Sequence, residues 1–397
     1  MKLSDRQGLT EVEHRALKSV GVQFFVNGAV VASYIPRLPE IRDDLGVSIS
    51  AIGVILAVAT GMGMIGSALQ APVITAVGTR RAMTFASLTL VAGLAFVGVA
   101  PNVWTLILAL AIVAVSDVIT DVAMNMQGSA LSAKRTVPVV NRLHGLWSVG
   151  TVIGGIIAAI SAALSVPLAV HLIAAAAVLG IVLVYVAQGL LHTDENLLGD
   201  DVASRSTDGG PAARRVVVTF VLLGGAAIVP EMITSDWAAF RLADDLATSN
   251  GTAGLGFVFF TIGMVIGRFS ADSVVLRLGA SRVLRFATAI AAVGTVIAML
   301  IPVVPVTLAG LVITGLGISV MFPQLYDLAV RSRRSKSALG GLTAGSRASL
   351  LMAPLVVGGL AGNGGLQVGV AVAVVTIPAS LLVLALSRRV AKEPAPR

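Results

Sequence analysis

Twelve runs of mostly apolar residues, each long enough to cross a membrane, dominate this chain. A helix needs about 20 consecutive apolar residues to span the hydrocarbon core of a bilayer. The composition agrees, because only 12% of the 397 residues are charged while 56% are hydrophobic. A soluble protein of this size would need far more polar surface. We therefore predict an all-α membrane protein with twelve transmembrane helices, which start near Leu17, Ile49, Ala82, Val103, Arg142, Leu168, Val216, Gly251, Val283, Val306, Leu339 and Leu366.

Basic residues gather in alternate loops of this arrangement. Of the 28 Lys and Arg residues, 23 lie in one set of alternate loops and in the two terminal segments, whereas only Arg37, Arg42 and Arg241 lie in the other set. Loops rich in Lys and Arg remain on the cytoplasmic side of a membrane. The pattern predicts a multi-pass inner (plasma) membrane protein with both termini in the cytoplasm. It also explains the net charge of +8 without a nucleic-acid partner.

Several kinds of chemistry are excluded by what the sequence lacks. The chain has no cysteine, so disulfides and thiolate metal sites are excluded. Its four histidines are not spaced as a metal-binding pair, and it has no glycine-rich phosphate loop. No Ser, His and Asp residues are arranged as a catalytic triad. We expect no enzyme activity, no metal and no cofactor.

The two halves of the chain repeat one another at a fixed offset. Eight residues recur with the same identity 201 positions later, namely Asp43, Asp44, Leu45, Ser48, Gly66, Gly78, Arg81 and Pro101. The longest polar stretch separates the two halves. We predict an N-terminal six-helix bundle over 1–191, a cytoplasmic linker over 192–215 and a C-terminal six-helix bundle over 216–397. A parallel repeat of six helices is the architecture of the major facilitator fold, which places its solute site between the halves near mid-membrane.

Particular motifs also resemble the major facilitator superfamily, over nearly the whole chain. They are Asn27-Gly28, the segments 37–41 (RLPEI) and 121–127 (DVAMNMQ), the segment 144–150 (HGLWSVG), and Gly267-Arg268 with Asp272. Within the superfamily they are most similar to the bacterial branch of fucose–proton symporter-like and YbjJ-type membrane proteins. The resemblance implies transport of a small solute. It also implies that the coupling acid is Asp121, with Asn125 as its polar companion.

Two departures from the superfamily pattern bear on function. Thr75 stands where the loop after the second helix usually carries an aspartate. The glycine-proline signature that many drug–proton antiporters carry in the fifth helix is absent from 144–155. The second departure argues against drug efflux.

Acidic residues inside the predicted helices are the main candidates for the mechanism, because a charge in the membrane is costly and its default role is functional. Asp117, Asp121 and Asn125 are spaced four apart and share one helix face. Two carboxylates on adjacent turns disfavour joint ionisation, which suits a group that gains and loses a proton. Glu231 follows Pro230, which loosens the helix near mid-depth. We predict proton coupling by Asp121, Asp117 and Glu231. The alternative is that these acids only hold neighbouring helices together, for example through an ion pair of Asp121 with Arg347 or Arg142.

Polar residues on the helices that line the cavity of this fold are the candidates for substrate binding. They are Asn27, Gln23, Tyr34, Asn125, Thr234, Gln324, Tyr326 and Arg347. Hydrogen bonds that only join helices are the alternative for this set. Arg268, with Asp272 four residues on, and Asp236 are the predicted gating residues. Trp147 is interpreted as a packing residue more readily than as a stacking surface for a sugar.

These observations predict a secondary transporter, working by alternating access, that imports a small polar, sugar-like solute together with protons. We expect it to act as a monomer whose partners are the small-molecule substrate, protons and the lipid bilayer. A proton-coupled exporter of a drug or metabolite is one alternative, since orientation and repeat would be the same. A membrane receptor or scaffold without transport is the other, and costly carboxyls in the helices argue against it.

Overall fold

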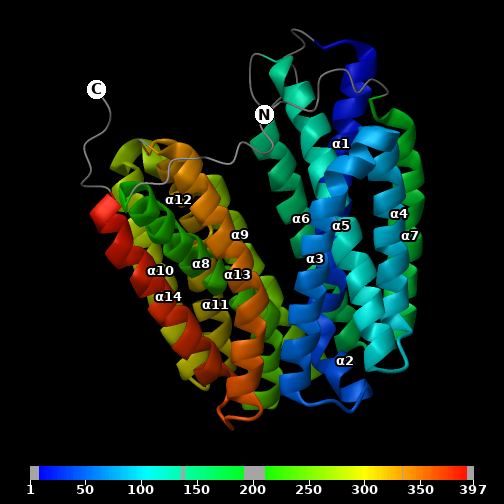
Figure 1. The fold of residues 1–397 in the computed structure, drawn as a ribbon. Coiled ribbons are helices and arrows are strands. Elements are labelled where there is room, and N and C mark those ends of the chain that lie inside the picture. Colours follow the sequence, from blue (N-terminus) through cyan, green and yellow to red (C-terminus); the bar gives the residue numbers. More distant parts are fainter. Residues whose placement is uncertain (1–8, 136–138, 192–210, 333, 391–397) are drawn as a thin grey trace. The chain divides into compact units, whose positions relative to one another are not determined.

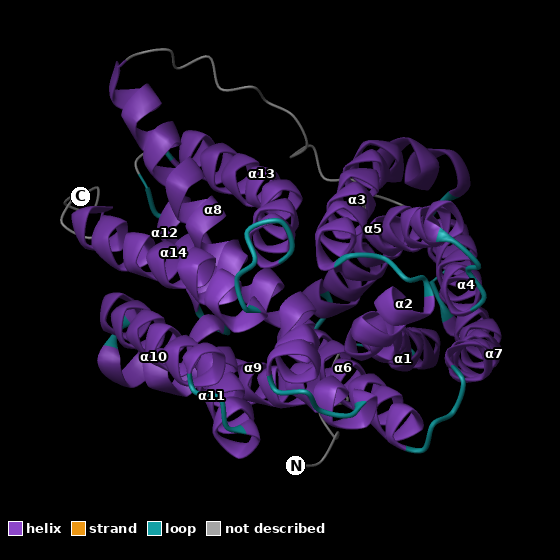
Figure 2. Cartoon of the chain, turned by 90° about the horizontal axis from the view of Figure 1, so that it is seen from below, coloured by secondary structure: helices purple, strands orange, loops and turns teal. Residues whose placement is uncertain are grey.

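The computed structural model describes residues 9–135, 139–191, 211–332 and 334–390, without the side chains at 141, 211–213, 272 and 388–390. Every regular element in this part of the chain is a helix (Figures 1 and 2). The helices are α1 (Glu11–Tyr34), a 3-10 turn η1 (Ile35–Arg37), α2 (Leu38–Asp44), α3 (Ile49–Val77), α4 (Thr79–Gly98), α5 (Val103–Ala133), α6 (Val140–Ala163), α7 (Leu168–Gly189), α8 (Pro211–Phe240), a π-helical turn η2 (Arg241–Asp245), α9 (Asn250–Leu278), α10 (Ala280–Leu300), α11 (Val304–Ile318), α12 (Met321–Val330), α13 (Ser335–Ala361) and α14 (Val368–Val390).

Twelve helical segments in the described residues are long and apolar enough to cross a membrane, which confirms the predicted number. Three of them are composite. The first continues from α1 through η1 and α2, over Glu11–Asp44. The seventh continues from α8 into η2, over Arg214–Asp245, and the tenth joins α11 to α12, over Val304–Val330. Several helices start earlier than the apolar pattern predicts, such as α1 at Glu11 instead of Leu17. Charged residues continue a helix beyond the hydrocarbon while their heads stay in water, so hydropathy alone underestimates helix length.

The described chain forms two compact units. Unit 1 consists of Met1–Tyr34 and Val58–Val202, and unit 2 consists of Ile35–Ala57 and Ala203–Arg397. The residues 35–57 belong to unit 2, in which η1 and α2 pack against α8. The start of α3 also packs closely on α13, because a Cβ at Gly53 would meet the Pro354 carbonyl. The exact bundle boundaries and the linker over 192–215 stay predictions, and 192–210 lie outside the described residues.

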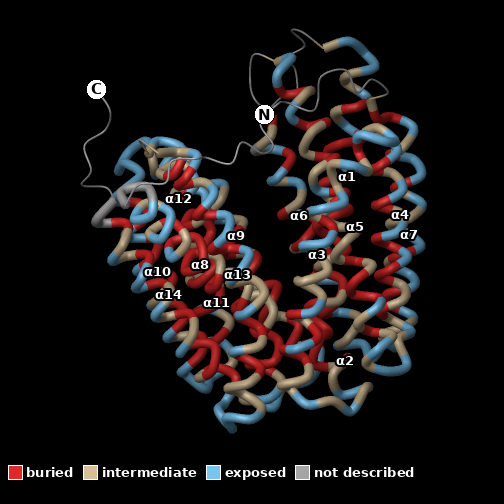
Figure 3. The backbone as a smooth tube through the Cα atoms, in the orientation of Figure 1, coloured by how far each residue is buried: buried red, intermediate tan, exposed pale blue. Residues whose placement is uncertain are grey.

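In each unit the helices carry buried positions on some faces and exposed positions on others (Figure 3). Many large apolar residues are among the exposed ones. Ile181 and Tyr185 on α7 are exposed by 72% and 75%, and Leu276 on α9 by 87%. Soluble proteins rarely leave such contiguous apolar surface uncovered, so lipid is the solvent that this surface requires.

Glycines allow the closest helix contacts in unit 1. A Cβ at Gly150 or Gly154 of α6 would collide with backbone atoms of Phe25 or Ala29 of α1. Small residues at these positions bring the two backbones together, as is common in membrane helix pairs. The tight fit fixes the register of α6 on α1, and thereby positions Asn27 and Trp147 opposite each other.

Candidate functional site

A three-residue polar cluster lies near the middle of the helices of unit 1. Asn27 of α1 is only 3% exposed and donates from Nδ2 to Oδ1 of Asp117 on α5 at 2.8 Å. Trp147 of α6 donates its indole N–H to Oδ1 of Asn27 at 2.9 Å. We call Asn27, Asp117 and Trp147 the amide cluster. It unites a predicted coupling acid with a predicted substrate residue.

The chemistry of the indole determines the orientation of the amide cluster. An indole N–H can only donate, so the Asn27 oxygen must face Trp147 and the Asn27 nitrogen must face Asp117. Oδ1 of Asp117 is therefore an acceptor whether or not the carboxyl carries a proton. A proton on Asp117 belongs on Oδ2. The sequence identified Asn27 and Asp117 but did not identify Trp147 as their partner.

One turn further along α5, Asp121 and Asn125 form a second polar pair. Asn125 donates from Nδ2 to Oδ1 of Asp121 at 3.1 Å and to the Asp121 carbonyl at 2.9 Å. The predicted four-residue spacing thus yields a direct contact. Asp121 is more exposed than Asp117. The helix therefore carries one partly buried carboxyl and, one turn later, one exposed carboxyl.

The two other candidates of α1 lie apart from the amide cluster. Gln23 is 1% exposed and donates to Oγ of Ser87 on α4 at 2.8 Å, and Ser87 contacts Thr120 of α5. This chain of hydrogen bonds joins three helices, which is the structural alternative raised for polar residues in membrane helices. Tyr34 is the last residue of α1 and is half-buried.

In unit 2, Glu231 of α8 accepts a hydrogen bond from Arg268 of α9 at 3.0 Å. The two side chains are 28% and 34% exposed, so the ion pair is reachable from solvent. Arg268 was expected to pair with Asp272, whose side chain lies outside the described residues. The structure thus links a predicted coupling acid to a predicted gating residue.

The turn of α8 that follows Glu231 carries buried polar atoms without partners. Thr234 and Trp237 are both fully buried, and neither the Thr234 hydroxyl nor the Trp237 indole N–H has a hydrogen-bond partner among the described residues. Other buried threonines of unit 2, such as Thr261 and Thr295, donate to the carbonyl four residues earlier. For Thr234 that residue is Pro230, which disrupts regular helix geometry. Asp236 on the same turn is half-buried and has no polar partner in the described structure.

The remaining candidates lie on α12 and α13. The tenth membrane segment breaks at Ser319 and Val320, between α11 and α12, and interrupted helices often border transport cavities. Gln324 of α12 has a buried Oε1 with no described partner, whereas Tyr326 is 51% exposed. Arg347 of α13 is exposed and forms no ion pair with the described residues of unit 2. The pairing of Arg347 with Asp121 stays a prediction.

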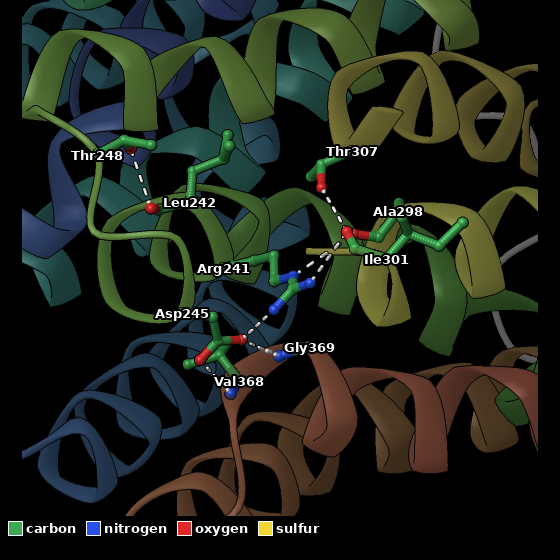
Figure 4. A network of polar contacts seen from close by, with 9 residues as sticks. All are labelled: Arg241, Leu242, Asp245, Thr248, Ala298, Ile301, Thr307, Val368 and Gly369. Carbon is green, nitrogen blue, oxygen red and sulfur yellow. Dashed lines mark hydrogen bonds and ion pairs between the residues drawn. The ribbon is translucent and has the colours of Figure 1, made fainter. Parts of the chain in front are cut away.

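A buried ion pair at one end of unit 2 was not foreseen from the sequence. Arg241 donates to Asp245 at 2.9 Å, with both side chains at least 95% buried. Asp245 also accepts from the backbone N–H groups of Val368 and Gly369, while Arg241 contacts the Ile301 carbonyl (Figure 4). The pair ties η2 to the end of α10 and the start of α14. The spacing of Arg241 and Asp245, four residues apart, was the only sign of this ion pair in the sequence. The backbone groups that the two side chains contact lie more than 50 residues away.

Neighbouring η2, Arg42 of α2 forms an ion pair with Asp244, and its guanidinium lies 5.4 Å from the centre of the Phe240 ring. Both interactions lie within unit 2 and attach the segment 35–57 to the end of α8. Among the described residues, no three His, Asp or Glu side chains gather as metal ligands would.

No protein-family model matches the chain. An uncharacterized transporter of Sinorhizobium fredii, y4wD, is 26% identical over 317 residues, covering 79% of this chain and 81% of the relative. An uncharacterized MFS-type transporter of Yersinia pestis is 28% identical over 371 residues, covering 91% and 94%.

Solved structures show the same fold at lower identity. The nucleoside transporter NupG superposes with a TM-score of 0.73 at 13% identity, covering 97% of this chain and all of NupG. A bacterial homolog of the human lysosomal transporter Spinster gives a TM-score of 0.70 at 15% identity, covering 97% and 99%. The fold is therefore the major facilitator fold. The two relatives to which the chain is similar in sequence are both named as transporters. The similarity to the fucose–proton symporter-like branch stays an expectation.

Proposed function

We propose that this transporter imports a small polar, sugar-like solute together with protons across the inner membrane, by alternating access and as a monomer with cytoplasmic termini. The observation that carries the proposal is the hydrogen bond from Asn27 to Asp117 near the middle of α5. A carboxyl at membrane depth is costly unless it serves a function. An amide that already donates to Oδ1 leaves Oδ2 as the one site for proton exchange.

Unit 1 would carry the proton in this scheme. Asp117 holds it in a partly buried position, and the more exposed Asp121 exchanges it with water, supported by Asn125. Two acids one turn apart do not favour double ionisation, so a single proton passing between them suffices for coupling. Trp147 keeps Asn27 oriented toward Asp117 throughout.

Unit 2 would supply hydrogen bonds for the solute. The Thr234 hydroxyl, the Trp237 indole and the Gln324 oxygen are buried polar groups without described partners, and leaving them unpaired is unfavourable. A polyhydroxylated solute offers the donors and acceptors that such groups require. Glu231, Arg268, Asp272 and Asp236 would respond to solute binding as coupling and gating residues, and Arg347, Tyr326, Gln23 and Tyr34 would complete the polar lining.

The first experiment identifies the solute. The purified full-length protein is screened by thermal shift against sugars, organic acids and amines, because a ligand of the native state raises its apparent stability. A hit among the sugars alone supports the proposed class. A hit confined to lipophilic cations would instead favour the exporter.

The second experiment tests the coupling. The identified solute is added to lightly buffered, de-energised cells that express the protein, and the external pH is recorded. Symport predicts alkalinisation with the wild type and with the control Asp44→Asn, an exposed acid without a described partner. Asp117→Asn should abolish alkalinisation. Uptake without a pH change, or full coupling in Asp117→Asn, would contradict the proposal.

A further inference from the structure

A cavity of about 510 Å³ lies in unit 1 where α3 passes into α4. Its walls come from α4 and α7, which pack against each other. Arg80 and Arg81 lie in the first turn of α4, Phe85 lies one turn further, and Ala187 and Gln188 belong to the end of α7. Phe85 is 65% exposed. The cavity thus combines two guanidinium groups with an outward-facing aromatic ring.

The two arginines of this cavity differ in their contacts. Arg80 donates from Nε and Nη2 to the Ala187 carbonyl at 3.2 and 2.9 Å, which joins α4 to α7. Arg81 is exposed and has no hydrogen bond or ion pair with any described residue. One guanidinium therefore fixes the wall of the cavity, and the adjacent one is available to an anion.

Unit 2 contains a second cavity of the same kind, of about 330 Å³. It is lined by Arg282, Arg285 and Phe286 of α10 and by Leu384 of α14. Arg282 and Phe286 occupy the positions 201 residues after Arg81 and Phe85, the same offset that relates the two halves of the sequence. Phe286 is 58% exposed, and Arg282 has no polar partner among the described residues. The same combination of side chains thus recurs at the equivalent place of each unit.

The physical setting of the two cavities favours an anion. The first turn of a helix carries the positive end of its dipole, so arginines placed there repel the helix end unless a negative group is present. The planar guanidinium matches the oxygens of a phosphate in two-point contacts. Both cavities lie at the ends of membrane-spanning segments, which is the depth of lipid head groups. Basic pockets between helices at this depth suit anionic lipids.

We propose that each cavity binds the phosphate of an anionic phospholipid, with Arg81 or Arg282 contacting the phosphate and Phe85 or Phe286 contacting an acyl chain. Free phosphate shares the anionic chemistry. The exposed phenylalanines favour the lipid, because free phosphate makes no use of an apolar ring. The proposal is independent of which solute the protein transports.

The test is native mass spectrometry of the purified full-length protein with phosphatidylglycerol or phosphatidylcholine added at equal concentrations. The wild type should retain two molecules of phosphatidylglycerol and much less phosphatidylcholine. Arg81→Gln and Arg282→Gln should each weaken binding at one cavity roughly fivefold, and the double variant at both. Inorganic phosphate is added in a competing arm and should displace neither lipid molecule.

The matched control is the double variant Arg142→Gln/Arg277→Gln. It changes the net charge equally, and both arginines are exposed at helix ends outside the two cavities. The control should retain both phosphatidylglycerol molecules. Circular dichroism and gel filtration of every variant establish that the fold is intact. Equal loss of lipid in the control, equal retention of phosphatidylcholine, or displacement by inorganic phosphate would each overturn the proposal.

Discussion

The indole nitrogen of Trp147 lies 2.9 Å from the amide oxygen of Asn27, and this contact decides which face of Asn27 meets Asp117. A tryptophan that would ordinarily be assigned to packing thus orients the amide that binds a partly buried acid. The indole donates to Asn27, and Asn27 donates to Asp117, so Trp147 acts on the carboxyl through the amide.

Replacing Trp147 by Phe removes the donor while keeping an aromatic ring. The Asn27 oxygen is then left unpaired, which costs about 1–3 kcal/mol. Proton-coupled uptake should fall with it, because Asn27 is no longer held toward Asp117. Unfolding in detergent, followed by circular dichroism against increasing dodecyl sulfate, measures the stability loss. Trp104→Phe is the control, since Trp104 is 80% exposed. Equal effects of both substitutions would show that ring size, not the hydrogen bond, matters.

Thr234→Val should leave the protein as stable as the wild type or slightly more stable. The substitution deletes a buried hydroxyl that has no described partner, so no hydrogen bond is lost. Thr295→Val, in contrast, removes the donor to the Ala291 carbonyl and should cost about 1 kcal/mol. If the hydroxyl serves the solute, Thr234→Val should also reduce the solute-induced thermal shift. A stability loss as large as that of Thr295→Val would mean that Thr234 already has a structural partner.

The pair Glu231–Arg268 can be measured by a double-mutant cycle with glutamine at either or both positions. Both groups are about a third exposed, so solvent screens the pair and we expect a coupling energy of roughly 0.5 kcal/mol. Transport should respond more strongly than stability, because the pair joins a proposed coupling acid to a proposed gating residue. Additive effects of the two substitutions on both quantities would exclude a functional ion pair.

Asp245→Asn should be among the most destabilising single substitutions in unit 2. It leaves the buried Arg241 guanidinium without its counter-charge, and breaking a buried ion pair costs about 3–5 kcal/mol. Thermal unfolding in detergent measures the loss. Asp327→Asn, which breaks the exposed pair with Arg331 at the same i, i+4 spacing, should cost less than about 1 kcal/mol. Similar losses for the two variants would contradict the importance given to burial.

Gly279→Ala and Gly340→Ala should shift stability in opposite directions. Neither position has an atom within 4 Å of an added Cβ, so space is not the difference. Gly279 has φ +81°, which a side chain makes unfavourable by about 1–3 kcal/mol. Gly340 is inside α13, where alanine is better by about 0.5–1 kcal/mol. Equal changes in the unfolding midpoint would refute the assignment of backbone strain.

Features that depend on neighbouring positions were predictable from the sequence. Membrane spans follow from the length of apolar runs, and the contact of Asp121 with Asn125 follows from their spacing on one helix. The internal repeat required only a comparison of the chain with itself. These predictions needed no knowledge of how distant segments pack.

Features that depend on packing between helices were not predictable. Trp147 and Asn27 are 120 residues apart, and only the close contact of α1 with α6 brings them together. Arg268 had a local acid four residues away and a distant one in Glu231, and the sequence favours the local one. The segment 35–57 follows the first membrane helix in sequence but belongs to unit 2, where η1 and α2 contact α8 and Gly53 contacts α13.

Gly78 and Gly279, 201 residues apart, have nearly the same backbone angles. The acids Asp117 and Glu231, in contrast, do not recur at this offset. The position equivalent to Asp117 is Ile318, and the position equivalent to Glu231 is Val30. The duplicated framework therefore carries unmatched chemistry in its two copies. Ancestral reconstruction should accordingly find that the turns were inherited from a common half-length precursor, whereas each acid was acquired by one copy alone after the duplication.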